Sequence, residues 1–184
     1  MTLNDKIEKF KRIMVCPDGT PVYDSKVIDK LKELRFFQAP ASSKYHGDYE
    51  GGLFDHSCRV TEILVELTKN NNLKWDAAES PYIVGMYHDL CKCDQYKKLW
   101  EPDERDRMYE FNPYTAVKGH GDKSVIMLST FVQLTDEEMM CILYHMGSFT
   151  DKSEWSYYTR AIKKYPNVLW THLADMIAAQ IEGR

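Results

Sequence analysis

The stretch SPYIVGMYHDLCK, residues 80–92, places His88 and Asp89 side by side at the end of an apolar run. This run predicts a buried helix, with Ser80 as its N-cap and Pro81 in its first turn. An ionised carboxylate is costly to bury without a partner, and a buried imidazole needs hydrogen bonds. The stretch therefore predicts that residues from elsewhere in the chain neutralise His88 and Asp89.

The composition is that of a globular protein rather than a disordered one. The chain has 184 residues, of which 43% are hydrophobic and 12% aromatic, enough for one domain with a real core over residues 1–184. The net charge of −4 argues against an extended nucleic-acid-binding surface. The five cysteines are an odd number without disulfide-framework spacing, which favours a reducing, cytoplasmic location. No signal peptide or membrane span is predicted.

Helical periodicity dominates the chain, so we expect an all-α fold. One exception lies between the polar segments YKKLW and MYEFN, where we expect a small β-hairpin around residues 96–112. A capping box, Thr135 to Glu138, predicts the start of a late helix. Asn167 is expected to cap the last helix, and an earlier helix is expected to run from Gly121 to about Val132.

Histidine and aspartate side chains recur on the buried faces of successive predicted helices. The set consists of His56, His88, Asp89, His120, His145 and Asp175. Side chains from successive helices of a bundle can meet at one depth. Imidazoles and carboxylates gathered in this way form a transition-metal site, and a metal would neutralise Asp89. Adjacent residues point about 100° apart around a helix, so His88 and Asp89 can lie on two sides of one site. A carboxylate placed between two ions can bridge them.

Each of these residues, taken alone, also has a purely structural explanation. A lone histidine on an apolar face is more often a hydrogen-bonded core residue than a ligand, but that account fits a set on separate helices poorly. His172, one turn before Asp175, is better explained as a supporting or packing residue. Cys91 and Cys93 lack the C-x2-C spacing of zinc sites, so we interpret both as packing cysteines.

The order of these residues resembles the HD superfamily of metal-dependent phosphohydrolases. The segments APASSKYHGDYEGGLFDHSCRV, YHDLCK, GHGDKSV, ILYHMG and LADMIAA are similar to the HD domain of bacterial 3′→5′ exoribonucleases and of small stand-alone relatives. The resemblance spans residues 36–182 and implies an HD-domain helical bundle, preceded by helices in residues 1–35. The chain lacks the OB-type domain of the exoribonucleases. Met146 stands where many relatives have a second histidine.

The resemblance also implies a ligand set. In the family, residues matching His56, His88, Asp89 and Asp175 hold one divalent metal. Members with the two further histidines, here His120 and His145, hold a second ion, bridged by the residue matching Asp89. Iron or manganese is most common in the family, while zinc, nickel and magnesium also occur, and imidazole ligands weakly disfavour magnesium.

The expected function is hydrolysis of a phosphoester in a nucleotide or short oligonucleotide by a metal-activated hydroxide. Asp89 and Lys92 are the expected catalytic residues, since Lys92 lies three residues after Asp89 and a cation is common there in the family. Each basic residue near a motif is more often a solvated surface charge, but their number favours a phosphate pocket. The candidate substrate-binding residues are Lys44, His46, Arg59, Lys118 and Lys123.

Two other classes remain open from the sequence. Some HD-fold proteins with the same ligands are mixed-valent diiron oxygenases, which an iron-specific, oxygen-consuming reaction would identify. The other class is a non-catalytic nucleotide-sensing module, although such modules usually lose ligands and this chain retains the whole set.

Overall fold

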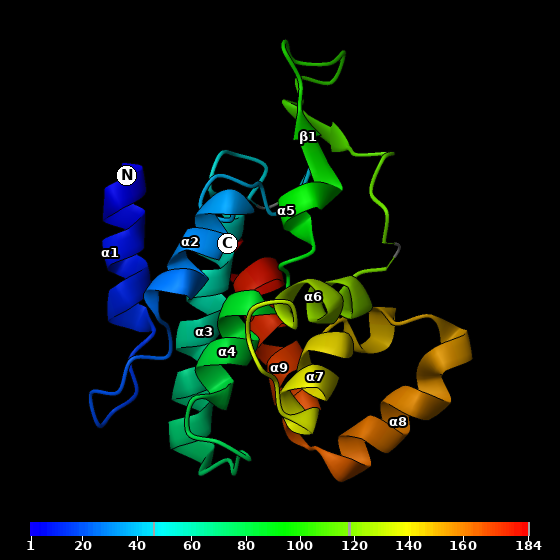
Figure 1. Cartoon of the computed structure of the whole chain (residues 1–184). Coiled ribbons are helices and arrows are strands. Elements are labelled where there is room, and N and C mark those ends of the chain that lie inside the picture. The colour runs from blue at the N-terminus through cyan, green and yellow to red at the C-terminus, as the bar shows by residue number, and fades with distance from the viewer. Residues whose placement is uncertain (46, 118, 184) are drawn as a thin grey trace.

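The chain folds into helices around one hydrophobic core, with a small antiparallel hairpin projecting from one end (Figure 1). The computed structural model describes residues 1–45, 47–117 and 119–183. Its elements are α1 (Leu3–Ile13), α2 (Ser25–Glu33), α3 (Gly52–Asn71), α4 (Ser80–Tyr87), α5 (Lys92–Gln95), β1 (Tyr96–Lys98), β2 (Tyr109–Phe111), α6 (Gly121–Leu128), α7 (Asp136–Leu143), η1 (Gly147–Phe149), η2 (Lys152–Glu154), α8 (Trp155–Lys164), α9 (Asn167–Met176) and the π-helical turn η3 (Ile177–Ile181).

The predicted hairpin is confirmed. Strands β1 and β2 pair antiparallel, with Tyr96 opposite Phe111 and Lys98 opposite Tyr109. β1 follows α5 without a break. The first residue of the strand, Tyr96, therefore lies close to the segment that carries His88 and Asp89, while the tip extends into solvent (Figure 1).

Local capping confirms one predicted helix start and corrects two others. The Thr135 hydroxyl accepts from the Glu138 backbone N–H, and the Glu138 carboxylate accepts from the Thr135 N–H, as a capping box requires. Ser80 is the first residue of α4 rather than its N-cap. Asn167 likewise lies inside α9, after Pro166. Its side chain instead donates to Glu137 and to the carbonyl of Lys74.

Two predicted helices end earlier than expected. α6 ends at Leu128 rather than near Val132. α4 ends at Tyr87, and a turn through His88 and Asp89 leads to Lys92, the first residue of α5. Lys92 therefore does not lie in the last turn of α4, where a cation would interact favourably with the helix dipole.

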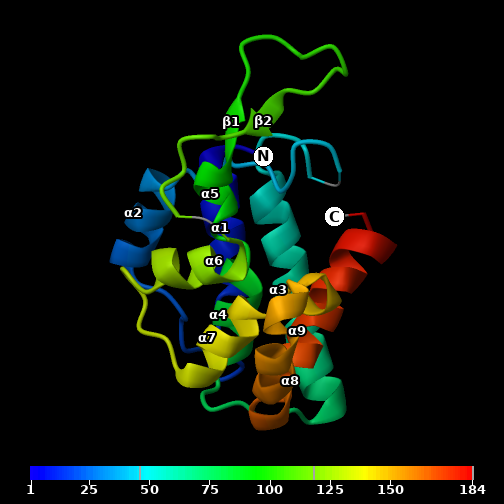
Figure 2. The same cartoon turned by 90° about the vertical axis from the view of Figure 1, so that its right-hand side faces the viewer.

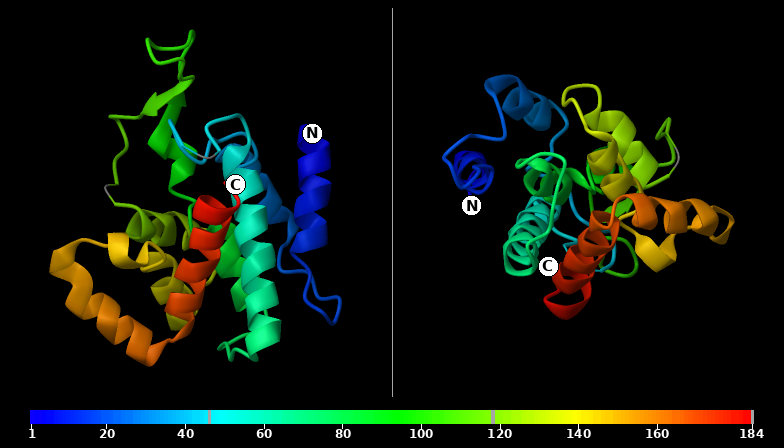
Figure 3. Two further views of the ribbon diagram at one scale, coloured as in Figure 1. Left: turned by 180° about the vertical axis from the view of Figure 1, so that it is seen from behind. Right: turned by 90° about the horizontal axis from the view of Figure 1, so that it is seen from below.

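α3 and α4 form the centre of the bundle, and α9 packs along α3 (Figures 2 and 3). The close approach of α3 and α4 depends on Gly85. A β-carbon there would lie 2.6 Å from the Cα of Thr61 and 3.0 Å from its backbone nitrogen. Only glycine permits this separation, which fixes how near the side chains of α3 come to the segment after α4.

The N-terminal helices share the core of the remaining chain. The Phe10 ring of α1 lies 6.0 Å from the Phe37 ring, and Phe37 lies 5.3 Å from Phe54 of α3. Phe36 continues this series of ring contacts to Tyr87 of α4, at 6.3 Å. Residues 1–35 are therefore packed onto the motif-bearing part. In the part of the chain that the structure describes, we find no helix with the length and apolar character of a membrane span.

Candidate metal centre

Five parts of the fold bring the predicted histidines and aspartates to one point beneath the hairpin. α3 carries His56, and α9 carries Asp175. The turn after α4 carries His88 and Asp89, while His120 immediately precedes α6 and His145 follows α7. His56, His88, Asp89 and His145 are buried, with at most 2% of each residue exposed.

One half of the cluster gathers around His56. Its Nε2 lies 3.2 Å from His88 Nε2 and 3.2 Å from Asp175 Oδ1. Oδ2 of Asp89 lies 3.6 Å from His56 Nε2 and 3.5 Å from His88 Nε2. Four donor atoms of different residues therefore face a common point, and the trio of His56, His88 and Asp175 has the spacing that a metal ion requires.

The other half gathers around the Oδ1 oxygen of Asp89. Oδ1 lies 2.7 Å from His120 Nε2 and 3.4 Å from His145 Nε2. Asp89 thus presents Oδ2 to His56 and His88, and Oδ1 to His120 and His145. This division matches the expectation that one carboxylate lies between two sites.

Backbone carbonyls fix the orientation of two histidines. Nδ1 of His88 lies 2.9 Å from the carbonyl of Gly85, and Nδ1 of His145 lies 2.7 Å from the carbonyl of Ile142. A carbonyl can only accept, so each Nδ1 carries a proton. In the neutral imidazole the inward-facing Nε2 therefore carries the lone pair that a metal ligand needs.

His172 supports the cluster from outside, as predicted. Its Nδ1 donates to the carbonyl of His145 over 2.8 Å. Gly147 allows this contact, because a β-carbon there would lie 2.5 Å from the His172 ring.

Burial and charge act against each other in the cluster. Burial opposes ionisation of Asp89, but Lys92, His88 and His120 hold the pKa of this carboxyl well below its usual value. Burial also disfavours the imidazolium of His120, yet Asp89 raises the pKa of His120 to about 10. For His145, burial prevails and lowers the pKa. The metal-free centre therefore holds an ionised Asp89 beside a protonated His120 and a neutral His145, and a metal ion that binds there would displace the His120 proton from Nε2.

Of the predicted basic residues that the structure describes, Lys92 is the one that enters the cluster. Its Nζ lies 2.6 Å from Asp89 Oδ2, and 11% of its side chain is exposed. Lys44 is exposed, with Nζ 5.9 Å from the centre of the Tyr45 ring, and it does not line the pocket above Asp89. His46 and Lys118 lie outside the described residues.

The positions of Arg59 and Lys123 do not support the substrate contacts predicted for them. Arg59 forms a two-pronged ion pair with Glu182, at 2.5 and 2.6 Å, which ties α3 to the C-terminal end of the chain. Lys123 is 2% exposed and bonds to Asp94 and Thr115. Both charges are used within the fold, and neither residue lines the pocket above Asp89.

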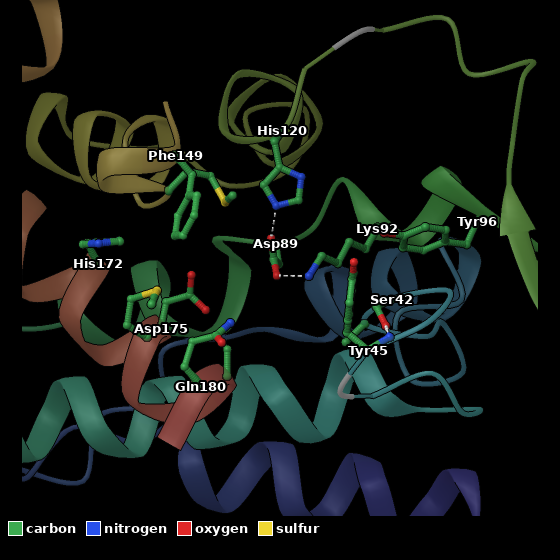
Figure 4. A pocket seen from close by; sticks show the side chains of 14 residues that line it. Ser42, Tyr45, Asp89, Lys92, Tyr96, His120, Phe149, His172, Asp175 and Gln180 are labelled. Carbon is green, nitrogen blue, oxygen red and sulfur yellow. Dashed lines mark hydrogen bonds and ion pairs between the residues drawn. The ribbon is translucent and has the colours of Figure 1, made fainter. Parts of the chain in front are cut away.

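A pocket of about 210 Å³ opens above the cluster (Figure 4). Asp89, Lys92 and Asp175 lie at its base, and an aromatic and polar wall surrounds them. The sequence-based prediction missed this wall, which consists of Ser42, Tyr45, Tyr96, Phe149 and Gln180. Tyr45 and Phe149 are 70% and 67% exposed. Large aromatic residues in polar loops were the available signal, but that signal does not indicate which loops meet.

The sequence-based prediction also missed a contact of His120 with Cys91. The Cys91 thiol, interpreted as packing, is indeed buried, but its Sγ also lies 3.4 Å from His120 Nδ1. Asp89, Cys91 and His120 form a third group with metal-ligand spacing. Adjacent to the pocket is a cleft of about 690 Å³, which shares His120, Met146 and Phe149 with it.

Comparisons of this chain with protein-family models, with curated proteins and with solved structures found no match. The family and the function are therefore proposed from the side chains of the centre.

Proposed function

We propose that this protein is an HD-type metal-dependent phosphohydrolase acting on a nucleotide or a short oligonucleotide. The observation that carries the proposal is the position of Asp89, whose two carboxylate oxygens face two different groups of histidines. The helical architecture and the order of the ligands along the chain agree with an HD fold.

The residues present fit a pair of divalent transition-metal ions. His56, His88 and Asp175 would hold one ion, His120 and His145 the other, and Asp89 would hold both. The Nε2 atom of His145 is buried and, within the described part of the chain, has no hydrogen-bond partner. Such an atom is costly in a folded protein unless it has a function, and a metal ion would give it one. The nitrogen-rich donor set suits iron, manganese, zinc or nickel better than magnesium.

When bound, such ions supply a nucleophilic hydroxide at neutral pH and polarise phosphoryl oxygens. Lys92 adds a cation at the base of the pocket, held by Asp89 at 2.6 Å. A phosphoryl group above Asp89 would meet the Lys92 ammonium, which stabilises negative charge that builds up in the transition state. Tyr45, Tyr96 and Phe149 line the pocket and offer aromatic surface to the rest of the substrate.

Pocket size supports a substrate with one phosphoryl group at the base. The volume of about 210 Å³ is smaller than a typical ligand pocket of ~300–1,000 Å³. The adjoining cleft of about 690 Å³ gives room for a nucleoside or a second nucleotide beyond Phe149. A long polymer gains no support from the net charge of −4.

The test is metal analysis of anaerobically purified protein, followed by assays on a panel of nucleoside monophosphates, cyclic nucleotides and short oligonucleotides. We expect about two metal ions per chain and release of phosphate or nucleotide from part of the panel. Asp89→Ala protein, prepared in parallel, controls for contaminating phosphatases.

Two outcomes would contradict the proposal. Iron-dependent consumption of dioxygen without phosphoester hydrolysis would indicate the oxygenase class. Tight nucleotide binding without turnover in metal-loaded protein would indicate a sensor module.

A further inference from the structure

A chain of hydrogen bonds leads from His120 to the wall of the pocket. His120 Nδ1 lies 3.4 Å from Cys91 Sγ, and Cys91 Sγ lies 3.5 Å from Gln95 Oε1. Gln95 Nε2 lies 3.2 Å from the hydroxyl oxygen of Tyr96. Cys91 and Gln95 are four residues apart, and the single turn of α5 brings both side chains to the same face.

The chemistry of each group sets the direction of these bonds. The Gln95 carbonyl can only accept, so the single proton of the Cys91 thiol is donated to it. The sulfur then accepts from His120 Nδ1–H, so a metal ion that replaces the proton on Nε2 leaves the ring with its remaining proton on Nδ1. The opposite nitrogen, Nε2, faces Asp89 Oδ1 at 2.7 Å. Cys91 therefore has the place that a carboxylate or carbonyl usually takes behind a metal-binding histidine.

At the other end, the Gln95 amide donates to Tyr96, so the proton of the Tyr96 hydroxyl is not needed for this contact. In the part of the chain that the structure describes, that hydroxyl donates to no residue. Tyr96 lines the pocket together with Asp89 and Lys92 (Figure 4). Burial is the main factor that raises the pKa of the Tyr96 phenol, so it is a hydrogen-bond donor at neutral pH.

We propose that Cys91 and Gln95 form a hydrogen-bond relay that has two functions. Cys91 is a positioning residue that holds His120 with Nε2 toward the centre. Gln95 orients Tyr96 so that its hydroxyl donates to a phosphoryl oxygen in the pocket, which makes Tyr96 a further phosphate-binding residue. The inference rests on the proposed metal centre and phosphoryl site, and it adds residues that neither includes.

Zinc-loaded protein tests whether Cys91 positions His120, without any substrate. Nitrogen-15 NMR of the histidine side chains should show His120 protonated at Nδ1 and metal-bound at Nε2. Cys91→Ala should weaken binding of the zinc ion held by His120 by about 10–100-fold in a chelator competition. Cys91→Ser, which keeps a donor and an acceptor, should recover most of that affinity. Cys93→Ala, a change in the neighbouring cysteine of the same segment, should match wild type.

Binding of inorganic phosphate tests the proposed hydrogen bond from the Tyr96 hydroxyl. Calorimetric titration of the zinc-loaded protein should show binding that Tyr96→Phe weakens at least about tenfold, the scale of one lost hydrogen bond to a charged group. Zinc content should not change. Gln95→Met, which keeps the side-chain length and removes the amide, should weaken phosphate binding in the same direction but less.

Several results would overturn the relay. These are metal bound at Nδ1 of His120, unchanged zinc affinity in Cys91→Ala, or phosphate affinity in Tyr96→Phe equal to that of wild type. Absence of phosphate binding in the wild type would also remove the role of Tyr96. None of these measurements uses turnover. A protein that binds zinc and phosphate as described, but hydrolyses no phosphoester, would therefore refute the proposed function and leave the relay intact.

Discussion

Asp89 and His120 face each other across 2.7 Å, between Oδ1 of the carboxylate and Nε2 of the ring. The second carboxylate oxygen, Oδ2, points to the opposite half of the cluster, 3.6 Å from His56 Nε2. One short side chain thus separates two groups of potential ligands. Changes at Asp89 should affect both groups, whereas changes at His120 or His56 should affect one.

Replacing Asp89 by alanine should remove metal and activity together. The change deletes a ligand shared by both proposed ions, so its effect should exceed that of Asp175→Ala, which deletes a ligand on one side only. Elemental analysis of both variants, purified side by side, gives the comparison. Full metal occupancy in Asp89→Ala would contradict the bridging assignment.

Replacing both His120 and His145 by alanine should leave about one metal ion per chain. The remaining ligands, His56, His88, Asp89 and Asp175, lie in the other half of the cluster. Metal analysis with a thermal melt distinguishes loss of one ion from loss of the fold. Two ions retained in a folded variant, or none, would show that the cluster is not divided into two sites.

Lys92→Met should lower both turnover and the stability of the metal-free protein. The buried pair with Asp89 has an Nζ–Oδ2 distance of 2.6 Å. Removing one partner of a buried pair costs about 3–5 kcal/mol of unfolding free energy. Bound metal should reduce this loss, since it neutralises Asp89. The turnover number should fall about a hundredfold, as when one charge-stabilising group is lost.

Lys123→Met is the matched control for this prediction. It removes another buried lysine with an acidic partner, but one outside the pocket. Stability should fall by about 1–3 kcal/mol as hydrogen bonds are lost, with turnover unchanged. A turnover number for Lys92→Met within about threefold of wild type would limit Lys92 to a structural role.

Gly85→Ala should weaken metal binding although residue 85 is not a ligand. The new methyl group would meet the Thr61 backbone at 2.6 Å, so α3 and α4 must separate. Overpacking of this kind costs about 1–3 kcal/mol, and the separation moves His56 away from His88. Zinc competition should show lower affinity in the variant.

Leu64→Ala provides the comparison, because it empties a fully buried position on α3 without pushing the helices apart. Its unfolding free energy should fall by about 2–5 kcal/mol, while zinc affinity of the folded protein should stay near wild type. Equal zinc affinity in Gly85→Ala and wild type would show that the helix separation does not control the centre.

Much of this protein follows from the sequence by itself. Helical periodicity predicted the helices, the capping box at Thr135 predicted the start of α7, and the polar segments near residue 100 predicted the hairpin. The buried His–Asp pair at residues 88 and 89 required partners, and inward-facing histidines on other helices identified them. These features are local, because periodicity and capping depend on residues within a few positions of one another.

The tertiary structure alone decided which charges reach the pocket. Arg59, Lys92 and Lys123 all lie near motifs in the sequence, but Arg59 and Lys123 are bound by Glu182 and Asp94. Lys92 alone of the three faces Asp89. The contact of Cys91 with His120 was equally inaccessible to sequence patterns. Such pairings depend on how helices distant in sequence pack together, and packing is set by side-chain shape over the whole core rather than by local spacing.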